Sequence, residues 1–344
     1  MSTSSRPHVL VTGGAGYIGS HTAVALHEAG FAPVLMDNLH NSDLQAVDGV
    51  RELCGEPVPF HQLDVRDGEG LTALFDSLEH AGTPLQGILH FAAHKAVGES
   101  VAKPAMYASN NVGGLGTLLE VADAHNVRNL VFSSSCTVYG EPEHVPVDES
   151  APFQPAESPY GWTKQASERV LTDHAATHPE HRVALLRYFN PIGAHPSAAI
   201  GELPLGVPNN LVPFLTQSVA GIRGALTVFG DDYPTADGTG VRDYIHVEDL
   251  ATAHVAAVDY LHAGGTDLCV NLGTGIGSSV RQILDLAAEV AGRPVPHEVV
   301  GRRLGDPAAV YADVTLAEAA LGWRAERTLA EIISSAYAWH ASTI

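Results

Sequence analysis

Basic residues and cysteines are both scarce in this sequence. Lys and Arg together number 18 against 39 Asp and Glu, which gives a formal net charge of −21. We therefore expect neither nucleic acid nor an anionic membrane as a partner, because both would be repelled by an acidic surface. The three cysteines, Cys54, Cys136 and Cys269, are too few and too scattered for a disulfide framework or a zinc site. A reducing compartment, the cytoplasm, is expected.

Long apolar runs and clustered metal ligands are also lacking. No window reaches the roughly 18 uninterrupted apolar residues that a membrane span needs. Residues 1–8 are polar and lack the apolar core of an export signal. The 19 histidines show no H-E-x-x-H or other close ligand pattern. We therefore expect no membrane span, no export signal and no metal.

Short apolar runs alternate with amphipathic stretches over the first 190 residues. Strands are expected at 8–11, 34–36, 88–91, 130–133 and 183–188. Helices are expected at 17–29, 106–125 and 159–174, the first ending at Gly30. Alternation of this kind predicts an α/β fold with a Rossmann-like, doubly wound parallel sheet.

The alternation breaks after Asn190. Residues 191–210 contain four prolines and three glycines, which indicates a loop-rich excursion. A helix at 211–220, a strand at 227–229, a loop at 230–240 and helices at 247–262 and 280–291 are expected to follow. We expect residues 1–190 to form the Rossmann domain, with a returning segment at about 241–265. Residues 191–344 should form a smaller, loop-rich α/β domain interleaved with it.

A glycine-rich turn follows the first expected strand. Gly13, Gly16 and Gly19 have G-x-x-G-x-x-G spacing between strand and helix. Glycines there allow backbone to approach a pyrophosphate, and the helix N-terminus presents free N–H groups to it. Asp37 closes the second strand, where a carboxylate can accept both ribose hydroxyls of NAD and would repel the 2′-phosphate of NADP. No Arg lies among residues 7–50, so NAD is the expected cofactor.

A tyrosine and a lysine share one face of the helix expected at 159–174. Ser158 is a plausible N-cap and Pro159 suits the first helical position. Tyr160 and Lys164 are four residues apart and so lie one turn from each other. A neighbouring ammonium, together with the positive nicotinamide, would lower the pKa of the phenol and make a phenolate accessible. Ser135, after an apolar strand, could hydrogen-bond the reacting oxygen and hold it against Tyr160.

With these motifs in place, the sequence resembles the extended short-chain dehydrogenase/reductase family, and within it the UDP-glucose 4-epimerases. The likeness extends over roughly residues 8–340. It rests on the segments VTGGAGYIGSHT, HFAAHKAVGES, NNVGG, FSSSCTVYG, SPYGWTK, LRYFNPIGAHPS, NNLVPF, FGDDYPTADGTGVRDYIHVEDLA, NLGTG and GRRLGD. The resemblance implies an NAD-dependent inversion at C4 of a UDP-hexose, as in galactose metabolism. It also implies a homodimer, and a second domain that binds the UDP-sugar.

The resemblance implies roles for individual residues. Those expected to line the NAD, beyond the three turn glycines, are Tyr17, Ile18, Asp37, Asn38, Asn41, Ser42, Asp64, Val65, Phe91, Ala92, Lys95, Asn110, Tyr160, Lys164 and Phe189. Those expected to meet the UDP-sugar are Ser135, Tyr160, Asn190, Asn209, Asn210, Leu211, Phe229, Arg242, Arg303, Asp306 and Val310. Arg242 and Arg303 would neutralise the diphosphate, which explains how so acidic a chain could bind an anion.

Val310 bears on the choice of sugar. By resemblance it borders the sugar pocket, where a large Tyr restricts the substrate to plain hexoses. A smaller residue leaves room for an N-acetyl group. We therefore hypothesise that UDP-N-acetylgalactosamine is also a substrate.

Two alternatives share some of these motifs. Nucleotide-sugar 4,6-dehydratases and decarboxylases of the same family carry a carboxylate after the catalytic hydroxyl, whereas Ser135 is followed by Cys136, Thr137 and Val138. Non-catalytic NAD-binding sensors usually lack the tyrosine and lysine. Both alternatives are disfavoured by these residues.

Overall fold

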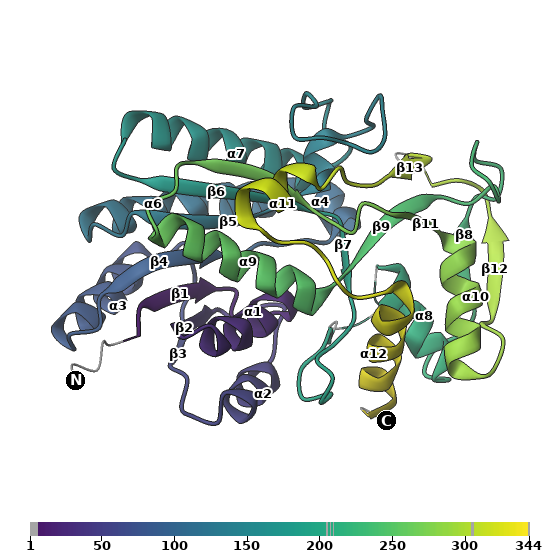
Figure 1. Cartoon of the computed structure of the whole chain (residues 1–344), viewed down its shortest axis with the longest axis horizontal. Helices are drawn as coiled ribbons and strands as arrows, with labels where there is room; N and C mark the ends of the chain where they lie inside the picture. Colours follow the sequence, from purple (N-terminus) through teal and green to yellow (C-terminus); the bar gives the residue numbers. More distant parts are fainter. Residues whose placement is uncertain (1–5, 204–205, 207, 209, 304–305, 343–344) are drawn as a thin grey trace.

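A seven-stranded, all-parallel sheet organises the chain (Figure 1). The computed structural model describes residues 6–203, 206, 208, 210–303 and 306–342. The sheet has the order β10-β6-β5-β4-β1-β2-β3. Its strands are β1 (His8–Thr12), β2 (Ala32–Asp37), β3 (Phe60–Gln62), β4 (Leu85–His90), β5 (Asn129–Ser135), β6 (Arg182–Tyr188) and β10 (Leu268–Leu272). The predicted doubly wound parallel sheet is confirmed.

Helices cover both faces of this sheet because its strands are apolar on both sides. Val9 and Val11 of β1 point to one face, and Leu10 points to the other. The first face packs against α1 (Tyr17–Glu28), α2 (Leu44–Cys54), α9 (Val247–His262) and α11 (Thr315–Leu321). The second packs against α3 (Gly68–His80), α6 (Gly114–Ala124) and α7 (Pro159–Thr177). Strand order reverses between β1 and β4, where folds of this kind bind ligands at the carboxyl ends of the strands.

Two smaller sheets lie beyond those carboxyl ends. β9 (Val241–His246) pairs with β7 (Asn190–Ile192), β11 (Gly277–Ser279) and β13 (Ala309–Val310). β8 (Leu226–Phe229) pairs with β12 (His297–Val300). A separate apolar core joins them to α8 (Leu211–Val219), α10 (Val280–Ala291) and α12 (Leu329–Ser342), which stand together at the right of Figure 1.

The structure changes several boundaries expected from the sequence. The expected helix at 106–125 is divided into α5 (Pro104–Tyr107), a π-helical turn at Ala108–Gly113, and α6, and a short α4 (Val97–Ala102) precedes it. The loop-rich excursion begins with β7, which was not expected. The returning segment at 241–265 begins with β9, which belongs to a smaller sheet. The large sheet continues past that segment to β10.

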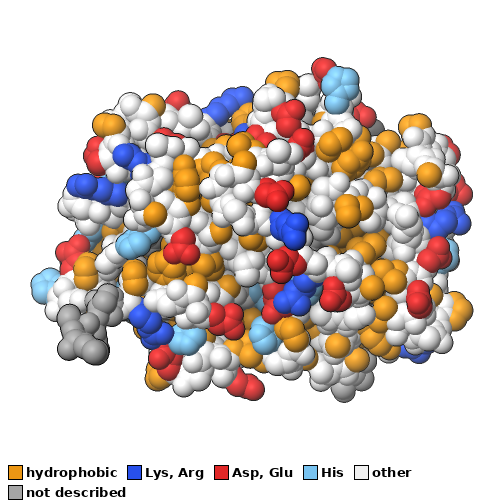
Figure 2. All heavy atoms as spheres, viewed as in Figure 1, with side chains coloured by type: hydrophobic (Ala, Val, Ile, Leu, Met, Phe, Trp, Pro, Cys, Tyr) orange, Lys and Arg blue, Asp and Glu red, His pale blue; other side chains and the backbone are white. Residues whose placement is uncertain are grey.

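Acidic and basic side chains are interspersed on the face of the molecule shown in Figure 2. The excess of acid therefore does not gather into a single patch on that face. Among the helices in the described ranges, none has the length and apolar character needed to cross a membrane.

Candidate active site

The glycine turn lies where β1 leads into α1, and its glycines are needed there. Gly13 has φ +70°, and a Cβ at this position would lie 2.9 Å from the backbone nitrogen of Ala92. A Cβ on Gly19 would lie 2.3 Å from the carbonyl oxygen of Gly13. Gly16 precedes α1 without a side-chain cap, so the first N–H groups of the helix stay free for a ligand. The turn therefore fits the pyrophosphate of a dinucleotide.

Asp37 closes β2 beside this turn and is almost fully buried. Its Oδ1 accepts hydrogen bonds from the Leu39 N–H at 2.9 Å and the Ser42 hydroxyl at 2.8 Å. Its Oδ2 accepts one from the Ala15 N–H at 3.2 Å. The carboxylate is thus fixed between the turn and the end of β2, as a ribose contact requires.

Asp64 belongs to a small polar group next to Asp37. Its carboxylate accepts from the Asn38 amide at 2.9 Å and from the guanidinium of Arg66 at 2.8 Å. The hydrogen bonds from Arg66 hold the pKa of Asp64 well below its usual range. Sequence reasoning did not single out Arg66, because nothing marks an arginine two residues after an aspartate as part of a site.

Tyr160 and Lys164 occupy the first turns of α7. The helix begins as predicted: the Ser158 hydroxyl accepts from the Gly161 N–H at 3.1 Å, and Pro159 follows the cap. The Ser135 hydroxyl lies near enough to the Tyr160 phenol to affect its pKa. Lys164 Nζ donates to the Ser133 carbonyl at 2.5 Å and lies 5.9 Å from the centre of the Tyr160 ring. The three predicted catalytic residues therefore lie together, where β5 ends and α7 begins.

Burial dominates the pKa values of this group. It raises the pKa of Tyr160 to about 12, although the nearby Ser135 hydroxyl opposes the change. It lowers the pKa of Lys164 to about 8, opposed by the nearby charge of Glu168. The lowering of the phenol pKa expected from Lys164 together with the nicotinamide stays a prediction.

A buried ion pair between Glu168 and Arg187 joins α7 to the large sheet. Glu168, one turn after Lys164, accepts three hydrogen bonds from the guanidinium of Arg187, at 2.6, 3.0 and 3.2 Å, and one from the Ser134 hydroxyl. Arg187 also donates to the Tyr139 hydroxyl at 3.1 Å, and that hydroxyl donates to Asn271 at 2.6 Å. The network connects α7 to β5, β6 and β10, and it was missed in the sequence because its members are far apart along the chain.

Four residues expected at the diphosphate and uridine meet in the second half of the molecule. The Arg303 guanidinium forms two hydrogen bonds of 2.9 Å with the Asp306 carboxylate. Arg242 Nη2 lies 3.5 Å from Asp306 Oδ1. The Arg303 guanidinium stacks 5.3 Å from the centre of the half-exposed Phe229 ring. Two cations, a carboxylate and an aromatic ring are thus within reach of one ligand.

Val310 packs in a small apolar cluster with Phe189 and Ala312. Cys136, the residue after Ser135, packs against the same cluster. Position 310 is therefore next to the Ser135 group. Asn190, the first residue of β7, follows Phe189 and pairs with Tyr244 of β9.

Lys95, Asn210 and Glu202 form a group that the sequence did not predict. Lys95 Nζ lies 3.1 Å from Glu202 Oε1, and the Asn210 amide is 3.5 Å from the same oxygen. Lys95 was expected at the cofactor and Asn210 at the substrate, so Glu202 connects the two sides. Asn209, expected at the substrate, lies outside the described residues.

The remaining predicted residues lie around the glycine turn and the carboxyl ends of the strands in the large sheet. The Tyr17 hydroxyl donates to the Gly193 carbonyl at 2.7 Å, and the Asn110 amide donates to Asn111 at 3.0 Å. Phe91 packs 4.7 Å from the ring of His254. Others are set by backbone position: Ile18 in α1, Asn41 after β2, Val65 after β3, Ala92 after β4 and Leu211 at the start of α8.

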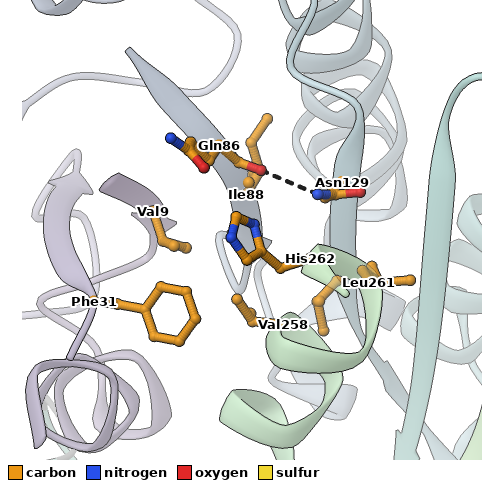
Figure 3. A pocket seen from close by; sticks show the side chains of 10 residues that line it. Val9, Phe31, Gln86, Ile88, Asn129, Val258, Leu261 and His262 are labelled. Atoms are coloured by element: carbon orange, nitrogen blue, oxygen red, sulfur yellow. Dashed lines mark hydrogen bonds between the residues drawn. The ribbon is translucent and has the colours of Figure 1, made fainter. Parts of the chain in front are cut away.

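A hollow lies where the strands of the large sheet begin, at the end opposite to the glycine turn, and it contains none of these groups (Figure 3). It is lined by the first residues of β1, β4 and β5 and the end of α9, including Val9, Ile88, Val258 and Leu261. Its polar contact is the hydrogen bond of 3.2 Å from the Asn129 amide to the Gln86 carbonyl. It is largely apolar and lies away from the glycine turn, so it is not the candidate active site.

Comparisons with known proteins agree with this geometry. The UDP-glucose 4-epimerase of Dictyostelium discoideum is 46% identical over 333 residues, 96% of this chain and 95% of that protein. A UDP-glucose 4-epimerase from Stenotrophomonas maltophila, solved with NAD and formylated UDP-arabinopyranose, has a TM-score of 0.94 at 46% identity and covers 98% of this chain and 99% of that one. A UDP-glucose 4-epimerase from Bifidobacterium longum, solved with NAD⁺ and UDP, has a TM-score of 0.91 at 43% identity, covering 97% and 98%.

The model of one protein family matches residues 9–273, which include the glycine turn, Asp37, Ser135, Tyr160 and Lys164. Together with the relatives, this match shows that the chain belongs to the NAD-dependent epimerase/dehydratase family.

Proposed function

We propose that this protein is an NAD-dependent 4-epimerase that interconverts UDP-galactose and UDP-glucose. One observation carries the proposal: Ser135, Tyr160 and Lys164 lie together in a fold whose glycine turn fits a dinucleotide. A separate group would bind a nucleoside diphosphate: the two arginines would meet its phosphates, the aromatic ring its base and the carboxylate its ribose. The group consists of Phe229, Arg242, Arg303 and Asp306. The likeness to UDP-glucose 4-epimerases over almost the whole chain supports the same assignment.

The residues present fit NAD. The free N-terminus of α1 and the close backbone at Gly13 would hold the pyrophosphate, and Asp37 would hold the adenosine ribose. Lys164 would hold the nicotinamide ribose. When bound, NAD accepts a hydride from the sugar and later returns it.

Tyr160 would remove the proton from the C4 hydroxyl and give it back after the sugar has turned over. The Ser135 hydroxyl, which lies near the phenol, would orient the reacting oxygen. Arg242 and Arg303 would hold the diphosphate while the hexose stays free to rotate. Binding energy is then placed away from the reacting atoms, which allows either face of C4 to be presented.

The dehydratase or decarboxylase alternative lacks the groups it requires. Cys136, Thr137 and Val138 follow Ser135 in a short 3₁₀ turn, so no carboxylate stands there. Cys136 does not replace one, since burial raises the pKa of its thiol to about 11. The non-catalytic sensor alternative does not account for the presence of Ser135, Tyr160 and Lys164 together.

The function is tested by purifying the protein without added cofactor and measuring bound NAD by absorbance and enzymatic release. UDP-galactose is then supplied and UDP-glucose is measured with a coupled dehydrogenase. We expect retained NAD and conversion without added NAD. A 4-keto-6-deoxy product would support the dehydratase instead, and bound NAD without any turnover would support the sensor.

We further propose that UDP-N-acetylgalactosamine is a substrate, because Val310 leaves more room than a tyrosine beside Phe189. Equal concentrations of the two UDP-sugars should both be converted by the wild type. Val310→Tyr should keep activity on UDP-galactose and lose most of its activity on the N-acetylated sugar. No conversion of the N-acetylated sugar by the wild type would disprove this extension.

The oligomeric state, the location in the cell and the division into domains are further proposals. A homodimer is proposed from the family resemblance, and light scattering during gel filtration tests it. A cytoplasmic location is proposed because Cys54, Cys136 and Cys269 are free thiols. We also propose residues 1–190 and the returning segment as the NAD domain, and residues 191–344 as the UDP-sugar domain.

A further inference from the structure

Two histidines and an aspartate meet at the edge of the large sheet where its strands begin. His174 lies in the last turns of α7, His181 directly precedes β6, and Asp123 lies in the last turn of α6. The candidate active site lies at the other edge, where the strands end (Figure 1). The histidines show no close ligand pattern in the sequence because the carboxylate comes from a different helix.

The donor atoms of these three side chains, one from each residue, all lie within 4.8 Å of one another, close enough to hold one ion. His174 Nε2 lies 3.2 Å and His181 Nε2 3.4 Å from the same oxygen, Asp123 Oδ1. A tetrahedral site with metal–ligand bonds of about 2.0–2.1 Å places its ligand atoms about 3.3 Å from one another.

The aspartate oxygen at the centre of this group has no hydrogen-bond donor. Asp123 Oδ1 is shielded from solvent, yet no neighbour meets it with hydrogen-bond geometry. The two imidazoles approach it without satisfying it, so a simple imidazole–carboxylate hydrogen bond does not account for the arrangement. A buried acceptor of this kind is costly unless something positive binds it.

We propose that Asp123, His174 and His181 bind a divalent late transition-metal ion, with Zn²⁺ as the ion to test. Two imidazoles and one carboxylate suit Zn²⁺ better than Mg²⁺ or Ca²⁺, which prefer oxygen ligands alone. The Asp123 side chain is 33% exposed, so water can take the fourth position. His178 stacks 4.3 Å from the His174 ring and helps to orient it.

Such an ion would join the ends of α6 and α7 to the start of β6. It would stabilise the fold and take no part in turnover, because the group contains none of the candidate active-site residues. Binding to the folded state alone raises the free energy of unfolding as the ion concentration increases.

The test uses the full chain after dialysis against a chelator. Titration with ZnCl₂, followed by calorimetry, should show one saturable site, and the melting temperature should rise with ZnCl₂ concentration. With Co²⁺ the protein should show the visible absorption bands of a tetrahedral site. These signals are independent of UDP-sugar turnover, so they do not depend on the proposed function.

Two variants locate the site. Asp123→Asn keeps the shape of the side chain and removes its charge, and His174→Ala removes one nitrogen ligand. Each should weaken Zn²⁺ binding by more than about 10-fold, since losing a direct ligand costs at least as much as losing an outer-shell partner. His144→Ala, at an exposed histidine in the loop before α7, should bind like the wild type. A cooperative melting transition in the absence of ZnCl₂ shows that the variants are folded.

Absence of saturable Zn²⁺ binding by the wild type would overturn the proposal. So would equal affinities for the wild type, Asp123→Asn and His174→Ala, because the ion would then lie elsewhere.

Discussion

Tyr160 and Lys164 share one turn of α7, yet burial moves their pKa values in opposite directions. Burial disfavours the charged form of each group, so the phenol holds its proton more firmly and the ammonium less firmly. The buried Tyr160 phenol therefore needs a neighbouring positive charge to act as a base at neutral pH.

Tyr160→Phe should lower kcat by about 10²–10⁴-fold, because it removes the group that transfers the C4 proton. The measurement is the coupled assay for UDP-glucose, together with the NAD content of the purified variant, which should stay at the wild-type level. Tyr260→Phe, at a half-buried tyrosine near the end of α9 and away from the candidate active site, is the matched control and should remain active. A near-normal rate for Tyr160→Phe would rule out the assigned role.

Lys164→Met keeps the length of the side chain and removes its charge. A lost positive charge raises the pKa of a nearby phenol, so the acid limb of the kcat–pH profile should move to higher pH, by about 1–3 units. The profile is measured on protein saturated with UDP-galactose and reconstituted with NAD. An acid limb at the wild-type pH would show that Lys164 does not tune Tyr160.

At the scale of the element, the turn between β1 and α1 combines a positive φ with close backbone contact. Gly13→Ala should lose bound NAD and destabilise the protein, because its Cβ would meet the Ala92 nitrogen at 2.9 Å. Gly55→Ala is the matched control, with φ +66° and no atom within 4 Å of the added Cβ. Both changes strain the backbone, and only the first also blocks the turn.

NAD per chain and the melting temperature separate the two effects. Gly55→Ala should lower stability by about 1 kcal/mol or more and keep its NAD. If Gly13→Ala also retains a full complement of NAD, close approach at this turn is not required.

Elements with a strong local pattern were the ones predicted well. The α7 start and the Tyr160–Lys164 pair follow from a cap and a four-residue spacing, which need no knowledge of the rest of the chain. The π-helical turn at Ala108–Gly113 was missed because its composition does not differ from that of a helix. β10 was left out of the returning segment because its pairing with β6 is a long-range contact.

The site was predicted unevenly for the same reason. Asp37 and the glycines belong to one contiguous motif, whereas Phe229, Arg242 and Arg303 could be assigned only through resemblance to a family. Arg187 and Glu168 carry no local signal at all. Their pairing appears only when α7 is packed against the sheet.

Four histidines buried in different parts of the whole molecule make its stability depend on pH. Burial lowers the pKa of His21 and His254 to about 4 and of His90 and His246 to about 3. The unfolded chain binds protons at these rings near pH 6.5, so it holds more protons than the folded chain as pH falls toward 4. The free energy of unfolding should therefore decrease over this range, by at most about 1.4 kcal/mol per pH unit for each histidine.

His254→Phe isolates one of these contributions. The ring lies between Phe91 and Tyr188, and its buried Nε2 has no hydrogen-bond partner, so a phenyl ring suits the position. Urea unfolding at pH 7 and pH 5 should show a smaller loss of stability in this variant than in the wild type. His144→Phe, at an exposed site, should lose as much as the wild type. Equal losses in all three proteins would contradict the prediction for His254.

The carboxylate of Asp306 has a consequence for the rate at which product departs. It already pairs with Arg242 and Arg303, so a diphosphate bound by these arginines would exchange with a carboxylate that belongs to the chain. On release of the nucleotide, the arginines would return to Asp306. Such an exchange would limit affinity chiefly by shortening the residence time of the complex. A short residence time suits a reversible catalyst, in which release of either sugar nucleotide must keep pace with chemistry.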